Sequence, residues 1–173
     1  MKPLLLAGAS ALLLVAGGVL AQASGPTDAQ IAHIVVTANQ VDIAAGTLAE
    51  SRGHSADVKA FGKRMVTDHT GVNKQATALL KKLGVKPEDN PTSESLKTGG
   101  EQNVQHLKTL KGAAFDKAYV DHEVAYHEQV IDALDQTLIP NAKNAELKAL
   151  LEKSRPAFVA HLDHAKQIQA KLE

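Results

Sequence analysis

Apolar residues recur every three or four positions along most of this chain, which is the spacing of helices that bury one face. The pattern predicts four long helices, over residues 27–51, 55–83, 113–138 and 144–172. No segment alternates between polar and β-branched or aromatic residues in the way that is typical of strands. The fold class that follows is all-α.

Local signals place the ends of these helices. Thr27 starts a T-x-x-Q capping box, and Ser55 is a second N-cap residue. Gly84 suits the left-handed conformation that ends many helices. Pro140 is expected to end the third long helix, and Pro156 is expected to kink the fourth, because proline removes a backbone hydrogen bond.

The segment between the second and third long helices predicts a long crossover. Residues 85–100 are rich in Pro, Ser, Thr, Asp and Gly, and Gly99 and Gly100 are expected to break any helix there. A short extra helix is expected over residues 101–110. Two helical hairpins joined by a long crossover predict a ferritin-like up-down four-helix bundle.

The beginning of the chain has the features of a signal peptide. Lys2 provides a positive start, residues 4–20 are apolar, and Ala-Gln-Ala at residues 21–23 matches the pattern of a cleavage site. We therefore expect a signal peptide over residues 1–23, a single domain over residues 24–173, and a periplasmic or secreted location. An uncleaved membrane anchor is the alternative, because the apolar run is nearly long enough to span a bilayer. No later segment is expected to span one.

Composition narrows the function further. The chain has 19 Lys and Arg against 19 Asp and Glu and only 3% aromatic residues, whereas nucleic-acid binders carry a basic excess and stacking aromatics. Nucleic acid is therefore excluded as a partner. The absence of cysteine excludes disulfides, thiolate metal sites and a lipoprotein anchor. An exported domain without disulfides depends on its hydrophobic core for stability.

One ionisable residue interrupts the apolar stripe of each long helix. These residues are Asp42, His69, His127 and His161. Buried polar groups must find partners, because leaving one unpaired costs about 1 to 3 kcal/mol. If the four converge, three imidazoles and one carboxylate suit a single Zn, Cu, Fe or Mn ion. We therefore take them as candidate metal ligands.

A hydrogen-bonded network without metal is the alternative for these four residues, because most buried polar groups are satisfied by hydrogen bonds. The helix register also raises a difficulty. Counted from the turns at about 1.5 Å per residue, Asp42 and His69 are expected to differ in height by ~9 Å, and His127 and His161 by ~7 Å. The sequence leaves the choice between metal and network open.

Neighbours of the stripe histidines have expected supporting roles. Glu123 and Asn73 each lie one turn from a stripe histidine, and Glu123 is expected to orient the ring of His127. Asp68 directly precedes His69, so it is expected to point away from the stripe as an ordinary surface carboxylate. The remaining histidines are expected to be solvated; they are His33, His54, His106, His122 and His164. For His164, which follows His161 by three residues, the alternative is a second ligand from the same helix.

Three segments carry a family resemblance: LAESRGHSADVKAFGKRMVTDHTGVNKQ from Leu48, AAFDKAYVDHEVAYHEQVI from Ala113, and RPAFVAHLDHAKQI from Arg155. In these segments the chain resembles an exported bacterial family known as domain of unknown function 4142. The resemblance implies a ferritin-like bundle in the periplasm or envelope. It also implies histidine at the three stripe positions, and glutamate where this chain has Asp42. The family supplies no activity.

Two functions from different classes remain. The first is a non-catalytic binding or structural module of the bacterial envelope, with an envelope protein as its partner. The second is a mononuclear transition-metal-binding protein that uses the core histidines. An oxygen-activating di-iron enzyme is disfavoured because such sites need Glu-x-x-His motifs, and the chain has none. No catalytic residue is therefore assigned, and the oligomeric state is left open.

Overall fold

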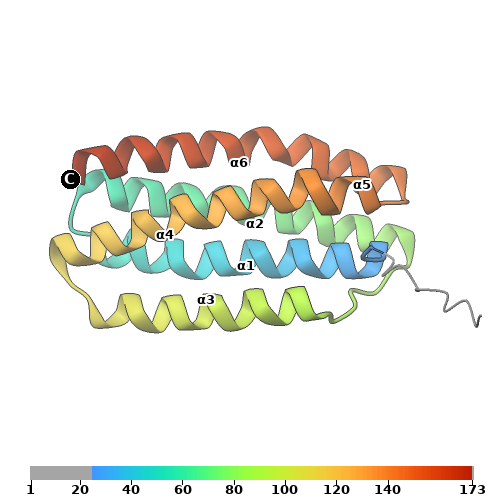
Figure 1. The fold of residues 1–173 in the computed structure, drawn as a ribbon, viewed down its shortest axis with the longest axis horizontal. Helices are drawn as coiled ribbons and strands as arrows, with labels where there is room; N and C mark the ends of the chain where they lie inside the picture. Colours follow the sequence, from blue (N-terminus) through green and yellow to red (C-terminus); the bar gives the residue numbers. More distant parts are fainter. Residues whose placement is uncertain (1–24, 173) are drawn as a thin grey trace, which may run out of the picture.

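Residues 25–172 are described by a computed structural model, and within this range every regular element is helical. The predicted all-α class is therefore confirmed. The elements are α1 (Asp28–Arg52), α2 (Ala56–Leu83), α3 (Pro91–Thr109), α4 (Gly112–Ala133), the π-helical segment η1 (Leu134–Leu138), α5 (Ile139–Asn141) and α6 (Ala145–Leu172) (Figure 1).

The local signals for helix ends act as predicted. Thr27 and Gln30 form a reciprocal capping box at the start of α1, with hydrogen bonds of 3.1 and 3.3 Å. The hydroxyl of Ser55 accepts a hydrogen bond from the backbone N–H of Val58 in the first turn of α2. Gly84 ends α2 in the left-handed conformation with φ 65°. These caps fix the first hairpin.

The crossover differs from its prediction. Instead of a linker and a short helix, α3 runs without interruption through Gly99 and Gly100. Asn90 caps its start in a capping box with Ser93. A Cβ at Gly100 would lie 2.6 Å from a methyl carbon of Val41, so the glycine lets α3 approach α1 closely. Capping and packing thus outweigh the roughly 1 kcal/mol by which each glycine weakens a helix.

The second hairpin also extends beyond its predicted end. After α4 the chain continues through η1 into α5, where Pro140 occupies the first turn and its missing N–H costs little. The last helix, α6, likewise continues through Pro156 as one helix. The carboxylate of Asp28 accepts hydrogen bonds from the backbone N–H groups of Lys143 and Asn144, which ties the start of α1 to this second turn.

The long helices lie side by side along one axis (Figure 1). α1 packs against α2 and α3, α4 packs against α6, and α2 packs against α6. α3 carries the chain back along the length of the bundle, so α2 and α4 run in the same direction (Figure 1). The result is a bundle of α1, α2, α4 and α6, with α3 laid along α1.

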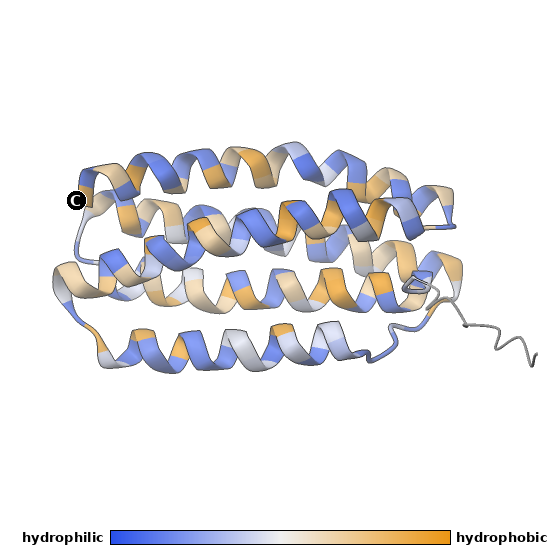
Figure 2. Cartoon of the chain, viewed as in Figure 1, coloured by the Kyte–Doolittle hydropathy of each residue, from blue (hydrophilic) through white to orange (hydrophobic). Residues whose placement is uncertain are grey.

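Two apolar clusters fill the two ends of this bundle, and each helix contributes apolar positions between polar ones (Figure 2). The cluster at the α1–α2 turn includes Ala45, Ala49, Val58, Phe61, Met65, Phe115, Tyr119, Val120, Val124, Ala165 and Ile168. The opposite cluster includes Ile31, Ile34, Val35, Leu134, Leu138, Leu147, Leu151 and Phe158. On every core helix, the predicted polar residue of the stripe falls between the two clusters. The bundle therefore has a polar layer at its middle.

One result bears on membrane association. Helix α1 is long and apolar enough to cross a bilayer, with a mean hydropathy of 1.2 over its most apolar window, contrary to the expectation for segments after residue 23. Of that window, 56% is buried inside the bundle, and core helices pass the same test of length and composition. The predicted signal peptide lies outside the described residues.

Candidate functional site

Three buried imidazoles meet in the polar layer. His69 on α2, His127 on α4 and His161 on α6 are each at most 1% exposed. One ring nitrogen from each lies within 4.8 Å of the others. Their ring centroids are 5.2 to 5.7 Å apart. The stripe histidines therefore converge from three different helices.

The outer nitrogen of His69 is held by a chain of amides from α1 and α2. Asn73 donates to the backbone carbonyl of Val36, which fixes its amide orientation, and its Oδ1 accepts from Nδ2 of Asn39 at 2.9 Å. The Oδ1 of Asn39 therefore faces Nδ1 of His69 at 2.7 Å and must accept a hydrogen bond from it. The proton of His69 thus lies on Nδ1, and Nε2 keeps a lone pair.

The other two histidines are oriented in the same way. His127 donates from Nδ1 to the backbone carbonyl of Glu123 at 3.0 Å. His161 donates from Nε2 to the carboxylate of Asp68 at 2.8 Å. Asp68 also accepts a long hydrogen bond of 3.4 Å from Arg64, and its side chain is 39% exposed. The expectation that Asp68 is an ordinary surface carboxylate is therefore wrong, because it points away from His69 but toward α6.

The ring nitrogen of each histidine that faces the layer has no hydrogen-bond partner in residues 25–172. Among the residues that the structure describes, no hydrogen bond reaches Nε2 of His69, Nε2 of His127 or Nδ1 of His161. A buried polar atom left unpaired costs about 1 to 3 kcal/mol. Each ring thus has one nitrogen held by a hydrogen bond and one nitrogen with a free lone pair. Metal-binding histidines have the same arrangement.

Two buried carboxyl groups lie beside the imidazoles. Asp42 on α1 and Glu123 on α4 are 2% and 0% exposed, and one oxygen of each lies within 4.8 Å of a ring nitrogen of His127. Oδ2 of Asp42 is 3.5 Å from Nε2 of His69. Within residues 25–172, no N–H or hydroxyl group donates to Oδ1 of Asp42 or to either oxygen of Glu123, but the two carboxyl groups lie within hydrogen-bonding reach of each other. The buried hydroxyl of Tyr119 has no hydrogen-bond partner in this range. The candidate set is thus three imidazoles and two carboxyl groups.

Burial shapes the charge of this layer. It raises the pKa of both the Asp42 and Glu123 carboxyls well above their usual values, and the nearby Asp42 raises that of Glu123 further. Burial also lowers the pKa of His69 well below its usual value and that of His127 to about 4. The pKa of His161 is lowered by burial, with Asp68 opposing the shift. Burial therefore shifts the pKa of each of these five groups in the direction that favours its neutral form.

The predicted height difference between the ligands is wrong. Asp42 and His69 lie about 10 and 13 residues from the observed helix ends at the first turn, and His127 and His161 about 14 and 16 from those at the second. Side chains also tilt toward the N-terminus of their helix. In an antiparallel hairpin this tilt moves the side chain whose Cα is nearer to the turn away from the turn, and it moves the other side chain toward the turn. Both height differences therefore become smaller.

The structure thus brings the three predicted histidines together, places the predicted Asp42 beside His69 and His127, and adds residues that the sequence assigned elsewhere. Glu123 was expected to support His127, yet its carboxyl group belongs to the candidate set itself. Its signal was present, because a residue one turn from a stripe residue shares its face. Asn39 has the same relation to Asp42, which follows it by three residues. Asp68 lacked such a signal, because its partner is on another helix.

The remaining histidines lie outside this set. His54 and His106 are exposed as predicted, while His33, His122 and His164 are half-buried rather than solvated. His33 is 3.2 Å from Asp89, His122 stacks on Tyr126, and His164 contacts Arg64 and Phe61.

The donor set limits what the layer can bind. Imidazole nitrogens with a carboxylate oxygen suit borderline metals such as Zn, Cu, Fe and Mn, at ligand distances near 2 Å. A di-iron carboxylate centre normally takes one Glu from each of two helices and a Glu-x-x-His motif from each of the other two. Here three helices supply histidine and only two supply carboxylates, so the set differs from that pattern.

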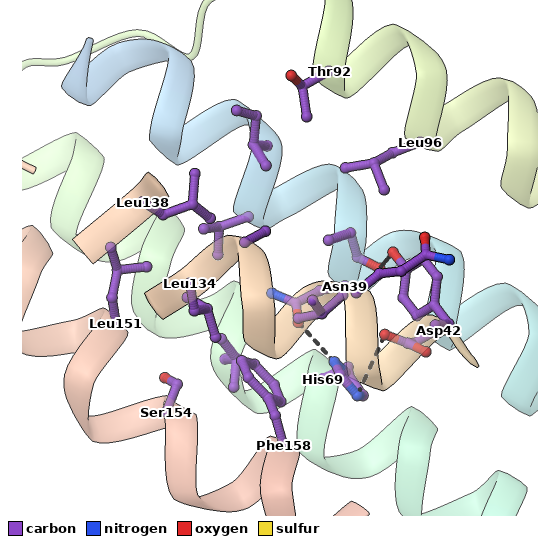
Figure 3. Close-up of a pocket in the computed structure, with 18 of the residues that line it drawn as sticks. Asn39, Asp42, His69, Thr92, Leu96, Leu134, Leu138, Leu151, Ser154 and Phe158 are labelled. Carbon is purple, nitrogen blue, oxygen red and sulfur yellow. Dashed lines mark hydrogen bonds and ion pairs between the residues drawn. The ribbon is translucent and has the colours of Figure 1, made fainter. Parts of the chain in front are cut away.

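A cavity of about 230 Å³ opens beside the layer. Asn39, Asp42 and His69 line one part of it, and Figure 3 shows the first two on either side of the imidazole, joined to it by dashed lines. Thr92 and Leu96 project toward the cavity from α3 (Figure 3). The candidate site is therefore flanked by space as well as by side chains.

Comparison with known proteins supplies a family without an activity. No curated protein and no solved structure matches the chain. A sequence model of one family, described as domain of unknown function (DUF4142), matches residues 17–168. This range contains every residue of the candidate site, and the match confirms the resemblance seen in the sequence. The chain therefore belongs to the family described as domain of unknown function, DUF4142.

Proposed function

We propose that this protein binds one transition-metal ion through His69, His127 and His161, with Asp42 or Glu123 completing the coordination. The observation that carries the proposal is the convergence of three buried ring nitrogens without hydrogen-bond partners among the described residues. Each ring is oriented by a hydrogen bond from its other nitrogen, which is how proteins position metal-binding histidines. A dication would also be neutralised by the two carboxylates.

A polar network without metal is the competing explanation. It would hold the layer together by hydrogen bonds between its members, and such networks rigidify a core only when their polar atoms are satisfied. In the described residues the ring nitrogens that face this layer instead have no hydrogen-bond partner; they are Nε2 of His69, Nε2 of His127 and Nδ1 of His161. The carboxyl groups of Asp42 and Glu123 reach each other but receive no hydrogen bond from a described N–H or hydroxyl group. The three unpaired nitrogens favour an absent ligand.

The proposed setting is a ferritin-like bundle exported to the periplasm. The parallel directions of α2 and α4, with α3 as the return, support ferritin-like connectivity. The apolar run at residues 4–20 supports export by a cleaved signal peptide over residues 1–23. In this proposal α1 is a core helix and not a membrane span. The protein stores or buffers its metal without catalysis, and an envelope protein is its partner.

Elemental analysis tests the metal proposal. The mature protein is exported to the periplasm, purified without a histidine tag and compared with a His69→Ala, His127→Ala, His161→Ala variant. We expect close to one transition-metal ion per chain in the first sample and none in the second. A variant with His54→Ala, His106→Ala and His122→Ala controls for the number of histidines and should keep the metal. If the native protein holds no metal after dialysis against Zn, Cu, Mn and Fe salts, the proposal is wrong.

A further inference from the structure

The cavity beside the polar layer extends from the buried side chains of that layer to the protein surface. Asp42 and His69 form part of its wall and are nearly fully buried, whereas Thr92 and Gln129 line it and are exposed. The cavity therefore extends from the gap between α3 and α4 to the candidate metal ligands. A small molecule that enters there reaches the polar layer.

Most of the cavity wall is apolar. Aliphatic side chains come from α1, α2, α3, α4, η1 and α6; they include Ile34, Val35, Val72, Leu96, Val130, Leu134, Leu138, Leu150 and Leu151. No Lys or Arg lines it. An anionic ligand would lose its hydration without finding an opposite charge, which is costly. The wall therefore excludes anions and favours a molecule that is mostly apolar.

The volume of the cavity and the aromatic side chains in its lining indicate which kind of molecule would fit. The volume of about 230 Å³ exceeds that of a dry apolar cavity of about 150 Å³, which suffices for benzene. Tyr126 and Phe158 both contribute rings to the lining. Aromatic rings pack well against other rings in offset or edge-to-face geometry. A single six-membered aromatic ring fits the space and the surfaces.

At the polar end of the cavity, a bound ligand could donate one hydrogen bond. The carboxyl group of Asp42 lines this end of the cavity, and Glu123 is its neighbour within hydrogen-bonding reach. The amide of Asn39 is already committed to His69 and Asn73, so it offers little to a ligand. A hydroxyl group at the inner end of a bound ring would donate to a free lone pair of the Asp42 carboxyl group.

We propose that this cavity binds a small neutral aromatic alcohol of the phenol class, with its ring between Tyr126 and Phe158 and its hydroxyl donated to Asp42. The inference goes beyond metal binding and does not depend on it, because every group that it uses belongs to the chain. When a metal is present, the ligand lies next to the coordinating residues.

Probe binding to chelator-treated protein tests this proposal without metal. Phenol, toluene and benzoate are titrated into the mature protein, and affinity is measured by calorimetry and by the shift in melting temperature. We expect phenol to bind about five-fold more tightly than toluene, because of its hydrogen bond to Asp42. We expect no binding of benzoate. In an Asp42→Ala variant, toluene should bind more tightly than phenol.

Filling the cavity provides the matched comparison. Ala133 lines the cavity on α4 and Ala38 lines it on α1, whereas Ala125 on α4 is exposed and lies outside it. Ala133→Leu and Ala38→Leu should each abolish phenol binding, and Ala125→Leu should leave it unchanged. The two filling variants come from different helices, so a folding defect in one leaves the other as the test.

Two results would overturn the proposal. One is the absence of a melting-temperature rise or heat of binding with phenol at millimolar concentration. The other is equal phenol affinity in the wild-type and cavity-filled proteins. Metal titration of the same samples keeps the two ideas apart. If the wild-type protein binds metal but not phenol, only the cavity proposal is removed. If it binds phenol but not metal, only the metal proposal is removed.

Discussion

His161, which is fully buried, donates a hydrogen bond from Nε2 to the half-exposed carboxylate of Asp68 at 2.8 Å. This bond fixes the ring so that Nδ1, not Nε2, faces the polar layer. It also connects the layer with the surface. Asp68 is therefore placed to orient His161, a proposed metal ligand, without coordinating the ion itself.

Replacing this carboxylate tests its role. In Asp68→Ala the ring of His161 loses its fixed orientation, and the affinity for Zn should fall by about 10- to 100-fold, the usual effect of such partners. Competition with a chromogenic chelator measures the affinity. Asp163→Ala, at an exposed position of α6, is the control and should bind Zn like the wild type. Equal affinities in the two variants would remove Asp68 from the site.

The stability of the metal-free protein separates a metal site from a structural network. In His127→Leu, His161→Leu the free energy of unfolding without metal should be unchanged or higher, because apolar residues replace buried polar groups without partners. Added Zn should raise the melting temperature of the wild type by mass action and leave that of the variant unchanged. Urea unfolding and thermal scans measure the two quantities. His106→Leu, at an exposed position, should keep the Zn effect.

Much of the fold follows from local sequence signals, but some elements depend on contacts between residues that are distant in the sequence. The caps at Thr27 and Gly84 act within one helical turn, so the sequence predicts them correctly. Helix α3 depends on the packing of Gly100 against Val41, which are distant in sequence. Propensity alone therefore predicts a break where packing sustains a helix. The Asn-Pro start of α3 was a local signal that the sequence did contain.

The polar layer follows from periodicity, and its details follow from side-chain direction. One polar residue in each stripe predicts that Asp42 and the three histidines share the core. The stripe assigns one residue per turn, however, so it gave Glu123 a supporting role rather than a place among the candidate ligands. The hydrogen bond from His161 to Asp68 joins two helices 93 residues apart, and no pattern within one helix predicts such a contact.

The pKa of His127 predicts how the metal-free protein responds to acid. Burial, with His161 nearby, lowers this pKa from the usual 6.5 to about 4. Between these values the unfolded chain binds the proton and the folded chain does not, so stability is lost as pH falls through this window. The loss attributable to this group is on the order of 3 kcal/mol.

A comparison with His127→Gln isolates this effect. The raised pKa values of Asp42 and Glu123 act in the opposite direction, since they lower stability as pH rises, and both carboxyls are present in the two proteins. Urea unfolding at several pH values from 7 to about 4.5 gives the free energies. The wild type should lose more stability than the variant over this range. Parallel curves would mean that His127 titrates normally in the folded protein.

Close contact between α1 and α2 depends on two facing glycines, Gly46 and Gly62. A Cβ at Gly62 would lie 2.7 Å from the carbonyl oxygen of Gly46 and from the backbone nitrogen of Glu50, neither of which can move without shifting α1. Gly62→Ala should therefore lower the free energy of unfolding by about 1 to 3 kcal/mol and weaken Zn binding by displacing His69. Gly71→Ala on the same helix meets nothing within 4 Å and should instead stabilise the protein by about 0.5 to 1 kcal/mol. Urea unfolding distinguishes these opposite signs, and stabilisation by both substitutions would show that the helices separate easily.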